Sequence, residues 1–347
     1  MPYLRQAWYM AAWSRDVAAG TPLAITMLDE PLVLYRRTDG APVVLEDRCC
    51  HRLAPLSLGR VEGDDIRCLY HGLKFAPDGA CCEMPGASRP PRAMKVRAFP
   101  VIERYSAIFV WMGDAERADA SLLPDFVGVE DPRWRMLPGR MEYEADYTLI
   151  QDNLLDLSHV AWVHRNSFGR GEAERSRAWA EGELSIRELA RGVRVTRWMP
   201  DSPTPLPQVP MVGPRCDRWS SFDYLAPGFF LMRGAVFPVG SVPERGEDPP
   251  MDAAVSRSFT AQAVTPLTRR RTAYYFCFGP AVEDPGAERL QHAFRDLALM
   301  AFEEDKTLIE RQQQVIDADP SRKMVLFDVD RAPSLYRKVL ERLRASE

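Results

Sequence analysis

The sequence predicts an α+β protein with two domains, the first all β and the second mixed. A chain of 347 residues is longer than one hydrophobic core usually organises. Between residues 32 and 112, short apolar runs alternate with turn residues, whereas the later part contains a long helical pattern at 286–316. The alternation stops within 114–124, where small and charged residues dominate. We therefore predict domains at 1–115 and 116–347.

In the first domain, the turn sequences Thr38-Asp39-Gly40 and Pro77-Asp78-Gly79 separate strand-like runs. The predicted strands are 32–37, 42–48, 73–76, 80–84 and the run 95–113.

In the second domain, the predicted elements are a helix near 148–164, strands within 183–199, 218–237 and 255–278, and the helix 286–316. Two proline-rich stretches, 200–214 and 238–251, are predicted to be irregular loops because proline lacks a backbone donor.

Composition and charge indicate an ordinary globular protein, with 46% hydrophobic and 27% charged residues. A net charge of -4 gives no reason to expect nucleic acid or an anionic membrane as partner. Arg5 and Arg15 interrupt the apolar N-terminal run, so neither a signal peptide nor a membrane span is predicted. We expect a cytoplasmic protein. Of its seven cysteines five cluster within 49–82 and two stand alone, which indicates metal binding or core packing rather than disulfides.

Four cysteine and histidine residues have the spacing of a metal site. Cys49 and His51 stand two apart, and after sixteen intervening residues Cys68 and His71 stand three apart. A 2Fe-2S cluster with two thiolates on one iron and two imidazoles on the other needs one Cys and one His from each of two loops. Structural zinc is the alternative, since two Cys and two His also suit that metal. Gly72 follows the last ligand and suits a tight turn.

The other nearby cysteines are not predicted to be ligands. Cys50 lies between two ligands, and Cys81 and Cys82 lie in a predicted hairpin strand. We predict that Cys81 and Cys82 are packed thiols, as most free cysteines are.

A second metal site is indicated by His159 and His164, which lie in an acidic segment with Asp152 and Asp156. Two imidazoles and one carboxylate, with open positions for oxygen, form the ligand set of non-haem Fe(II) oxygenases. The two histidines are five residues apart, about 140° around an ideal helix. They can converge only if the helix ends or widens between them, so we predict an irregular turn there.

The carboxylate ligand is predicted to be Asp305, chosen over Glu303 and Glu304 by helical periodicity. Asp305 falls within an apolar stripe, Glu303 on the solvated face and Glu304 near the margin. The stripe comprises Phe294, Ala298, Ala301, Ile309 and Gln312. A buried carboxylate is costly unless it is paired or binds metal, and an arginine pair or a loop cap is the alternative. His292 is predicted to face solvent without a functional role.

These motifs, their order and the opening RQAWYMAAW closely resemble the phthalate-type branch of the Rieske non-haem iron oxygenases. The likeness is to the terminal oxygenase subunits of vanillate O-demethylase, dicamba O-demethylase and toluenesulfonate methyl-monooxygenase. The resemblance implies an N-terminal Rieske β-sandwich, a helix-grip α+β catalytic domain with mononuclear Fe(II), and a homotrimer. It also implies that Asp156 bridges His71 of a neighbouring subunit to His159 for electron transfer, and that Asn153 lies near the iron.

The resemblance further implies a monooxygenase that uses O2 to insert one oxygen atom into a methyl C–H of an aromatic, acidic substrate. Oxidative O-demethylation releasing formaldehyde, in the catabolism of aromatic compounds, is the leading expectation. Aryl-methyl or ring hydroxylation is the alternative. No G-x-G-x-x-G fingerprint follows a strand, so NADH is expected to act only through a separate flavin and ferredoxin-type reductase.

Substrate contacts are predicted on the strands and the long helix of the second domain. The candidates are Phe229, Phe230, Arg233, Gln262 and Phe302. Core packing of the aromatic residues and a surface salt bridge of Arg233 are the alternatives.

Two other classes of protein remain open. One is a Rieske-type electron carrier, in which His159, His164 and Asp305 are structural. The other is an interaction protein stabilised by zinc.

Overall fold

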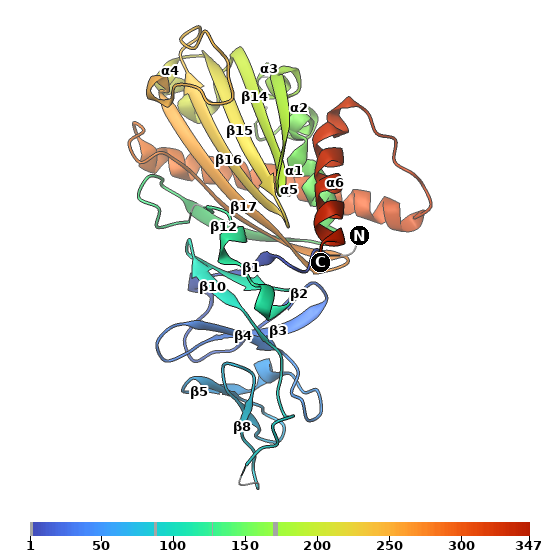
Figure 1. Cartoon of the computed structure of the whole chain (residues 1–347). Coiled ribbons are helices and arrows are strands. Elements are labelled where there is room, and N and C mark those ends of the chain that lie inside the picture. Colours follow the sequence, from blue (N-terminus) through green and yellow to red (C-terminus); the bar gives the residue numbers. More distant parts are fainter. Residues whose placement is uncertain (1–2, 87–88, 127, 169–172) are drawn as a thin grey trace. The chain divides into compact units, whose positions relative to one another are not determined.

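The computed structural model describes residues 3–86, 89–126, 128–168 and 173–347 (Figure 1). Residue contacts divide the chain into two compact units. Within the described residues, the first unit runs to Leu123 and includes Thr265–Arg269, and the second comprises Pro124–Val264 and Arg270–Glu347. This division falls after Leu123, and the boundary at residue 115 stays a prediction.

The first unit consists of three antiparallel sheets, which confirms the all-β prediction. The first sheet has the order β1 (Trp8–Trp13), β11 (Ala107–Trp111), β10 (Val101–Arg104). The second has β2 (Leu23–Met27), β3 (Glu30–Arg36), β4 (Pro42–Glu46), β9 (Ala98–Phe99). The third has β5 (Arg60–Glu62), β6 (Asp65–Arg67), β7 (Lys74–Phe75), β8 (Cys81–Glu83).

Side chains from the second and third sheets share one hydrophobic core. Val33 pairs with Leu45 across β3 and β4, and both are fully buried beside Phe75 of β7. Cys49 and Cys68 belong to the same core. The two predicted thiolate ligands are therefore anchored by packing, while their loops reach the surface of the unit.

The second unit contains one seven-stranded antiparallel sheet with helices, which confirms the mixed α+β prediction. Its strand order is β12 (Leu137–Tyr143), β18 (Arg271–Pro280), β17 (Ser256–Thr268), β16 (Phe229–Phe237), β15 (Arg215–Leu225), β14 (Gly192–Pro203), β13 (Glu183–Leu189). Side chains alternate between the two faces of these long strands, so one face is directed toward the helices.

The long helix α5 (Ala287–Ala318) packs against β12 and β18, and Figure 1 shows it crossing one face of the sheet. Its apolar contacts include Phe294 on Phe278, with ring centroids 5.3 Å apart. Gln313 is buried where Gln312 was predicted, because the stripe drifts over the length of the helix. His292 is exposed, as predicted.

Five further α-helices are described in this unit. They are α1 (Tyr147–Leu155), α2 (Val160–Val163), α3 (Ala173–Glu181), α4 (Val209–Val212) and α6 (Arg331–Ala345). No helix within the described ranges is both long and apolar enough to cross a membrane.

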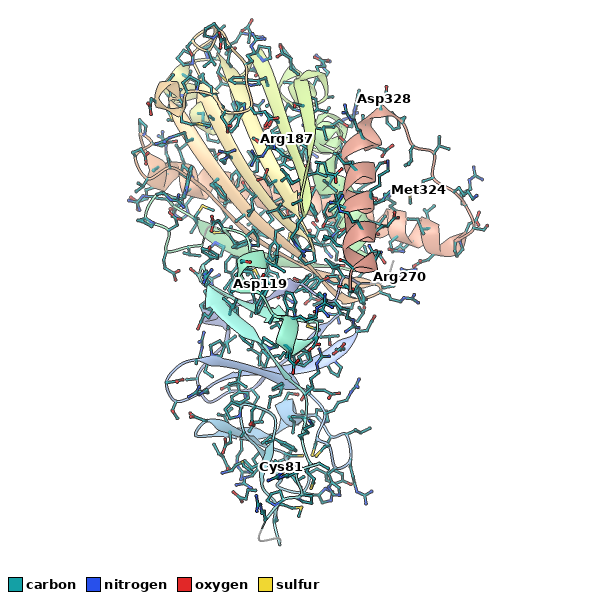
Figure 2. All side chains as sticks on the ribbon, in the orientation of Figure 1. Cys81, Asp119, Arg187, Arg270, Met324 and Asp328 are labelled. Atoms are coloured by element: carbon teal, nitrogen blue, oxygen red, sulfur yellow. The ribbon has the colours of Figure 1, made fainter. Side chains whose placement is uncertain are left out.

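The proline-rich stretches differ partly from the prediction. β14 continues to Pro203 through a register shift between Met199 and Ser202, and α4 forms further along the same stretch. A bulge of this kind tolerates residues that cannot donate to the ladder. The loop after α5 exposes four apolar side chains, Met324 among them (Figure 2).

Candidate metal sites and active-site cavity

The two ligand loops of the first unit have the same backbone geometry. The amide of Cys49 donates to the Ala54 carbonyl over 2.8 Å, and the Cys49 carbonyl accepts from Leu53. The amide of Cys68 likewise donates to Leu73 over 2.8 Å, and its carbonyl accepts from Gly72. The fourth residue after each cysteine has a positive φ, 58° at Leu53 and 74° at Gly72. Gly72 therefore makes the tight turn that was predicted for it.

The four predicted ligands form two facing pairs. The Cys49 and Cys68 thiols are in hydrogen-bonding contact within the core. The His51 and His71 rings are exposed and face each other edge to face, with centroids 4.6 Å apart. This pairing of like with like suits a two-iron cluster. A single zinc ion would instead need all four to converge, and among the described residues they do not form such a group.

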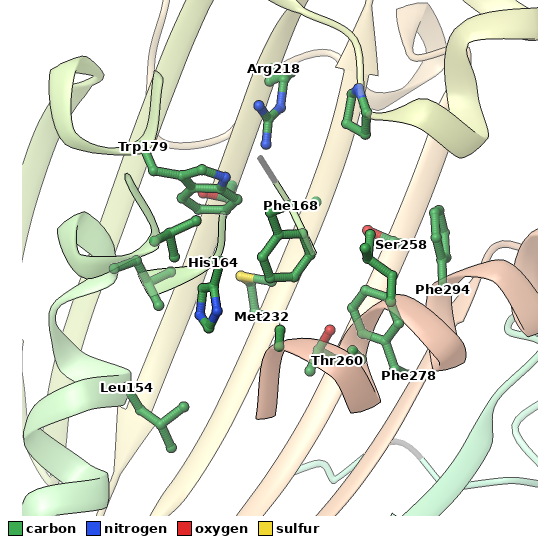
Figure 3. A pocket seen from close by; sticks show the side chains of 18 of the residues that line it. Leu154, His164, Phe168, Trp179, Arg218, Met232, Ser258, Thr260, Phe278 and Phe294 are labelled. Carbon is green, nitrogen blue, oxygen red and sulfur yellow. The ribbon is translucent and has the colours of Figure 1, made fainter. Parts of the chain in front are cut away.

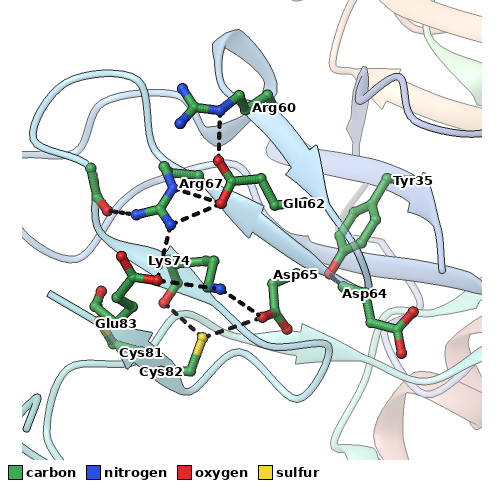
Figure 4. A network of polar contacts seen from close by, with 11 residues as sticks. Tyr35, Arg60, Glu62, Asp64, Asp65, Arg67, Lys74, Cys81, Cys82 and Glu83 are labelled. Atoms are coloured by element: carbon green, nitrogen blue, oxygen red, sulfur yellow. Dashed lines mark hydrogen bonds and ion pairs between the residues drawn. The ribbon is translucent and has the colours of Figure 1, made fainter. Parts of the chain in front are cut away.

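Polar contacts position both ligand loops. Arg67 donates to the Gly72 carbonyl over 2.7 Å while it pairs with Glu62 and Glu83 (Figure 4). In the first loop, the buried carboxylate of Asp47 accepts from the amide and hydroxyl of Ser57. Burial raises the pKa of the Cys49 thiol to about 11, so the thiolate form depends on bound metal.

The other cysteines differ in exposure. Cys50 and Cys81 are half-buried and pack against the core of the first unit. Cys82 is exposed, with its sulfur 3.6 Å from Asp65, so its prediction as a packed thiol is wrong. Successive side chains of β8 point to opposite faces, and only one of the two cysteines can reach the core.

In the second unit, the chain breaks its helix between the two predicted iron ligands. α1 ends at Leu155, and Asp156 is extended and caps a short 3-10 helix that ends at His159. α2 then spans Val160–Val163, and His164 follows it in a non-helical conformation. The predicted irregularity is present, and it brings the two rings to a centroid distance of 5.2 Å.

His159, His164 and Asp305 converge, and their ligand atoms all lie within 4.8 Å of one another. One carboxylate oxygen of Asp305 lies 3.4 Å from His159 Nε2, and the other lies 3.4 Å from His164 Nε2. Asp305 is 5% exposed, on the inward face of α5. Two imidazoles and one carboxylate around a common point are the donor set of a mononuclear non-haem iron.

The second nitrogen of each ring is also held. His159 Nδ1 lies 2.5 Å from the main-chain oxygen of Asp156, and His164 Nδ1 lies 3.0 Å from Glu304 Oε2. The same carboxylate accepts from the Ser167 hydroxyl and the Asn166 amide. Such outer contacts fix the tautomer and orientation of ligand histidines. Sequence periodicity placed Glu304 at the margin of α5 and gave it no role.

The surroundings shift the pKa values of the two histidines in opposite directions. Burial lowers the pKa of His159, although Asp305 opposes that effect. Burial also disfavours charge on His164, but Asp305 and Glu304 outweigh it and raise its pKa. Two carboxylates thus face His164 from opposite sides and favour positive charge on its ring.

Asn153 and Asp156, both predicted to act near the iron, lie beside the triad. Asn153 Nδ2 donates to Asp305 over 3.0 Å and is 3.4 Å from His159 Nε2. The Asp156 carboxylate accepts from the amide and hydroxyl of Ser158, so its contact with His159 runs through the main chain. A bridge from Asp156 to a second subunit stays a prediction.

A cavity of about 170 Å³ opens beside the triad (Figure 3). Its walls come from one face of β15, β16 and β17, from α5 and from the segments carrying the histidines. Apolar and aromatic side chains dominate the walls. They include Leu154, Val160, Phe168, Trp179, Met232, Phe278 and Phe294. The buried Thr260 hydroxyl in this wall has no hydrogen-bond partner in the described structure.

Three of the predicted substrate contacts, Phe230, Gln262 and Phe302, line this cavity. Their contact with substrate stays a prediction. Phe229 and Arg233 do not line it. Strand alternation separates Phe229 from Phe230, because neighbouring residues of β16 point to opposite faces. The Arg233 guanidinium instead lies over the Trp219 ring and pairs with Asp248.

Comparison with known proteins agrees with both sites. Residues 7–102 match the Rieske [2Fe-2S] domain, and residues 143–346 match the vanillate O-demethylase oxygenase C-terminal domain. The chain belongs to this family of Rieske oxygenase components.

Individual relatives share its full length. The toluene-4-sulfonate monooxygenase system iron-sulfur subunit of Comamonas testosteroni is 37% identical, covering 99% of this chain and 98% of that protein. The oxygenase component of dicamba O-demethylase from Stenotrophomonas maltophilia is 32% identical, covering 100% of both. A crystal structure of dicamba monooxygenase bound to 3,6-dichlorosalicylic acid superposes with a TM-score of 0.87 at 28% identity, covering 100% of this chain and 99% of that one.

The cofactors are therefore a 2Fe-2S cluster and a mononuclear iron, and the residues present fit both. The paired thiols and paired imidazoles of the first unit suit the two irons of a Rieske cluster. His159, His164 and Asp305 would supply two imidazoles and one carboxylate to the mononuclear iron.

Proposed function

We propose that the protein inserts one atom of O2 into a methyl C–H of an aromatic anion, as the oxygenase component of a multicomponent monooxygenase. The observation that carries this proposal is the triad of His159, His164 and Asp305 at the wall of an aromatic-lined cavity. When bound, the mononuclear iron supplies O2 activation and the cluster supplies stored electrons.

The leading reaction is oxidative O-demethylation. An aryl methyl ether, O2, two electrons and two protons give a phenol, formaldehyde and water. Oxygen insertion into the methyl C–H leaves a hemiacetal, which breaks its C–O bond to release formaldehyde. The residues of this chain would hold the ring between apolar walls, with the methyl group toward the histidines. A relative named O-demethylase at 32% identity supports this reaction.

Aryl-methyl hydroxylation is the second candidate, because identity to the toluene-4-sulfonate monooxygenase subunit is higher, at 37%. The same insertion into a methyl group on carbon gives a stable benzylic alcohol. Nothing in the iron ligand set separates the two reactions, so the position of the methyl group in the cavity decides between them.

A single-turnover experiment tests the proposal. The purified protein, with both metal sites loaded and pre-reduced, is mixed with O2 and a panel of methoxybenzoates and methyl-substituted aryl carboxylates and sulfonates. Formaldehyde identifies O-demethylation, and benzylic alcohol without formaldehyde identifies methyl hydroxylation. No product from any compound would refute the proposed reaction. Two irons per chain, rather than three, would instead favour the electron carrier.

The proposal includes a homotrimer in which the cluster of one subunit docks near the iron of the next, through the Asp156 bridge. Two exposed apolar surfaces support it. Leu53, Leu69 and Tyr70 are exposed in the loops that carry the cluster histidines, and Leu58 is exposed shortly after the first loop. Trp162 is exposed on α2, between the two predicted iron-ligand histidines in the sequence. Light scattering on the purified protein measures the assembly, and a monomer at micromolar concentration would contradict it.

The remaining parts of the proposal concern the domains, the redox partner and the location. The domains would be 1–115 for the cluster and 116–347 for the mononuclear iron. A separate flavin and ferredoxin-type reductase would deliver electrons from NADH. A reducing cytoplasm would suit the seven free cysteines.

A further inference from the structure

One basic side chain, Arg218, lines the cavity wall. Arg218 of β15 is 7% exposed and lines the cavity together with His164 and Asp305. It also lines a neighbouring cavity of about 200 Å³, with Trp179 and Phe168 common to both. Figure 3 shows its guanidinium directed from the strand into the space above Phe168. A ligand in the main cavity can therefore meet this group directly.

The charges in the wall are few and separate. Among the described residues that line the main cavity, Arg218 is the only lysine or arginine and Asp305 the only carboxylate. Asp305 is already occupied by the two histidines and Asn153, as a metal ligand must be. Asp305 therefore serves the metal, and Arg218 is the charged side chain of the described wall that can attract the anionic group of a ligand.

A second buried arginine adds to this positive region. Arg197 of β14 pairs in register with Ser220, which lines the cavity, so its side chain leaves the sheet on the same face. Its guanidinium carbon is 5.7 Å from the Trp179 ring centroid, and that of Arg218 is 5.1 Å from the same centroid. The indole of Trp179 is therefore contacted by two cations.

Arg197 forms no ion pair with the described residues. It is 5% exposed, and its Nε and Nη1 have no hydrogen-bond partner in the part of the chain that is described. Burial lowers its pKa to about 10, although the charge of Asp156 opposes that effect. A buried donor without an acceptor destabilises a fold, and such groups concentrate where function requires them. An anion bound at Arg218 would offset part of this unbalanced charge.

We propose that Arg218, with Arg197 and Trp179 behind it, forms a binding site for the carboxylate or sulfonate group of the substrate. The inference rests on the proposed function and names the group that fixes the substrate's orientation. The planar guanidinium matches a carboxylate or sulfonate with two parallel hydrogen bonds. With the anionic group held there, the apolar remainder of the molecule extends along the aromatic walls toward the iron ligands.

A purely structural role for both arginines, holding Trp179 by cation–π contact, predicts something different. In that case the loss of Arg218 would weaken the binding of every ligand alike, charged or neutral. If Arg218 recognises an anion, its loss weakens the binding of the anion alone. A charged ligand and its neutral isostere therefore distinguish the two roles.

The test measures binding without turnover. Dissociation constants of 4-methoxybenzoate, 4-methylbenzenesulfonate and the neutral 4-methoxybenzamide are obtained by calorimetry on the oxidised holoenzyme without reductant. The variants are R218Q, R218K and R197Q, with R187Q as the matched control on β13 of the same sheet, where the side chain is half exposed. Iron content and circular dichroism establish that each variant is folded and loaded.

We expect R218Q to weaken binding of an anion about 10- to 100-fold, the loss of a charge-assisted hydrogen bond, and to leave the amide within about twofold. R218K should lose less affinity for the anion because it keeps the positive charge. R197Q should weaken anion binding by a smaller factor than R218Q does. Unchanged anion binding in R218Q, or an equal loss for the amide, overturns the inference. Failure of the wild-type protein to bind any of the anions overturns it as well.

These results are separable from those of the turnover experiment. Anion binding that depends on Arg218, without oxygenated product in single turnover, would retain the binding site and remove the proposed reaction. Turnover of aryl anions with the same KM in R218Q would retain the reaction and remove the site.

Discussion

Replacing Glu304 by alanine tests whether a residue that touches no metal controls the mononuclear site. The carboxylate accepts three hydrogen bonds, from His164 Nδ1 at 3.0 Å, from the Ser167 hydroxyl at 2.6 Å and from the Asn166 amide at 3.2 Å. E304A removes all three, and it leaves His164 free to rotate or to change tautomer. The expected result is weaker Fe(II) binding with an intact cluster.

The size of the expected effect depends on whether water can replace the lost carboxylate as acceptor for each donor. Asn166 is exposed, so water replaces its lost acceptor at little cost. Ser167 and His164 are buried, and each loses its acceptor at about 1–3 kcal/mol. Loss of the His164 contact alone corresponds to a 10- to 100-fold weaker Fe(II) affinity, the range measured for outer contacts of metal ligands. The Ser167 contribution should appear as a lower unfolding free energy.

The assay is a competition titration of Fe(II) against a chelator, with the visible absorption of the cluster as internal reference. E304Q should fall between wild type and E304A, because an amide oxygen can still accept from His164. E303A is the matched control, since Glu303 is the adjacent residue of α5 and is exposed. Fe(II) affinity in E304A equal to that of E303A would refute the reasoning.

Three further changes have defined outcomes. D305A should lose the mononuclear iron and keep the cluster, so that metal analysis gives two irons per chain, and a third tightly bound iron would exclude Asp305 as a ligand. D156A should retain both spectroscopic signatures and lose steady-state turnover, and normal turnover would exclude the electron-transfer bridge. Arg36 lowers the pKa of Glu103, so their pair stabilises the fold above the normal glutamate pKa and ceases to do so as the pH falls through the lowered value. At pH 7 the free energy of unfolding of E103Q should therefore be about 1 kcal/mol below that of wild type, which thermal unfolding measures. The difference should vanish on acidification, and a constant difference across pH would contradict this explanation.

The sequence predicted most strands whose side chains alternate and missed β1, which is buried throughout, and the short strands β5 and β6. All six residues of β1 are buried, so WYMAAW shows no alternation to detect. β5 and β6 have three residues each and exist because they pair with each other and with β7. Such strands are determined by partners distant in the chain, which local patterns do not contain.

The sequence could single out candidate metal ligands because the chemistry of such sites constrains residue type and spacing together. The pocket was less predictable, because a cavity wall depends on register. Phe229 and Phe230 look equivalent in sequence, yet only Phe230 lines the cavity. Arg218 carried no signal in the sequence that separated it from Arg233, and only the fold shows which of the two arginines faces the triad side of the sheet.

Glu304 and Asp305 show which contacts helical periodicity can predict and which it cannot. Adjacent positions on a helix are about 100° apart, so when Asp305 points inward, Glu304 must leave α5 at its margin. From the sequence pattern alone, this margin of the helix is predicted to be partly exposed to solvent and to have no functional role. In the fold, however, the margin of α5 faces the segment just after His164, and Glu304 closes the outer side of the histidine whose inner side faces Asp305. The imidazole is thus held between two successive carboxylates of one helix turn. The inner contact belongs to the predicted metal ligand, which composition and stripe position can single out, while the outer contact arises only because a second segment packs against the helix.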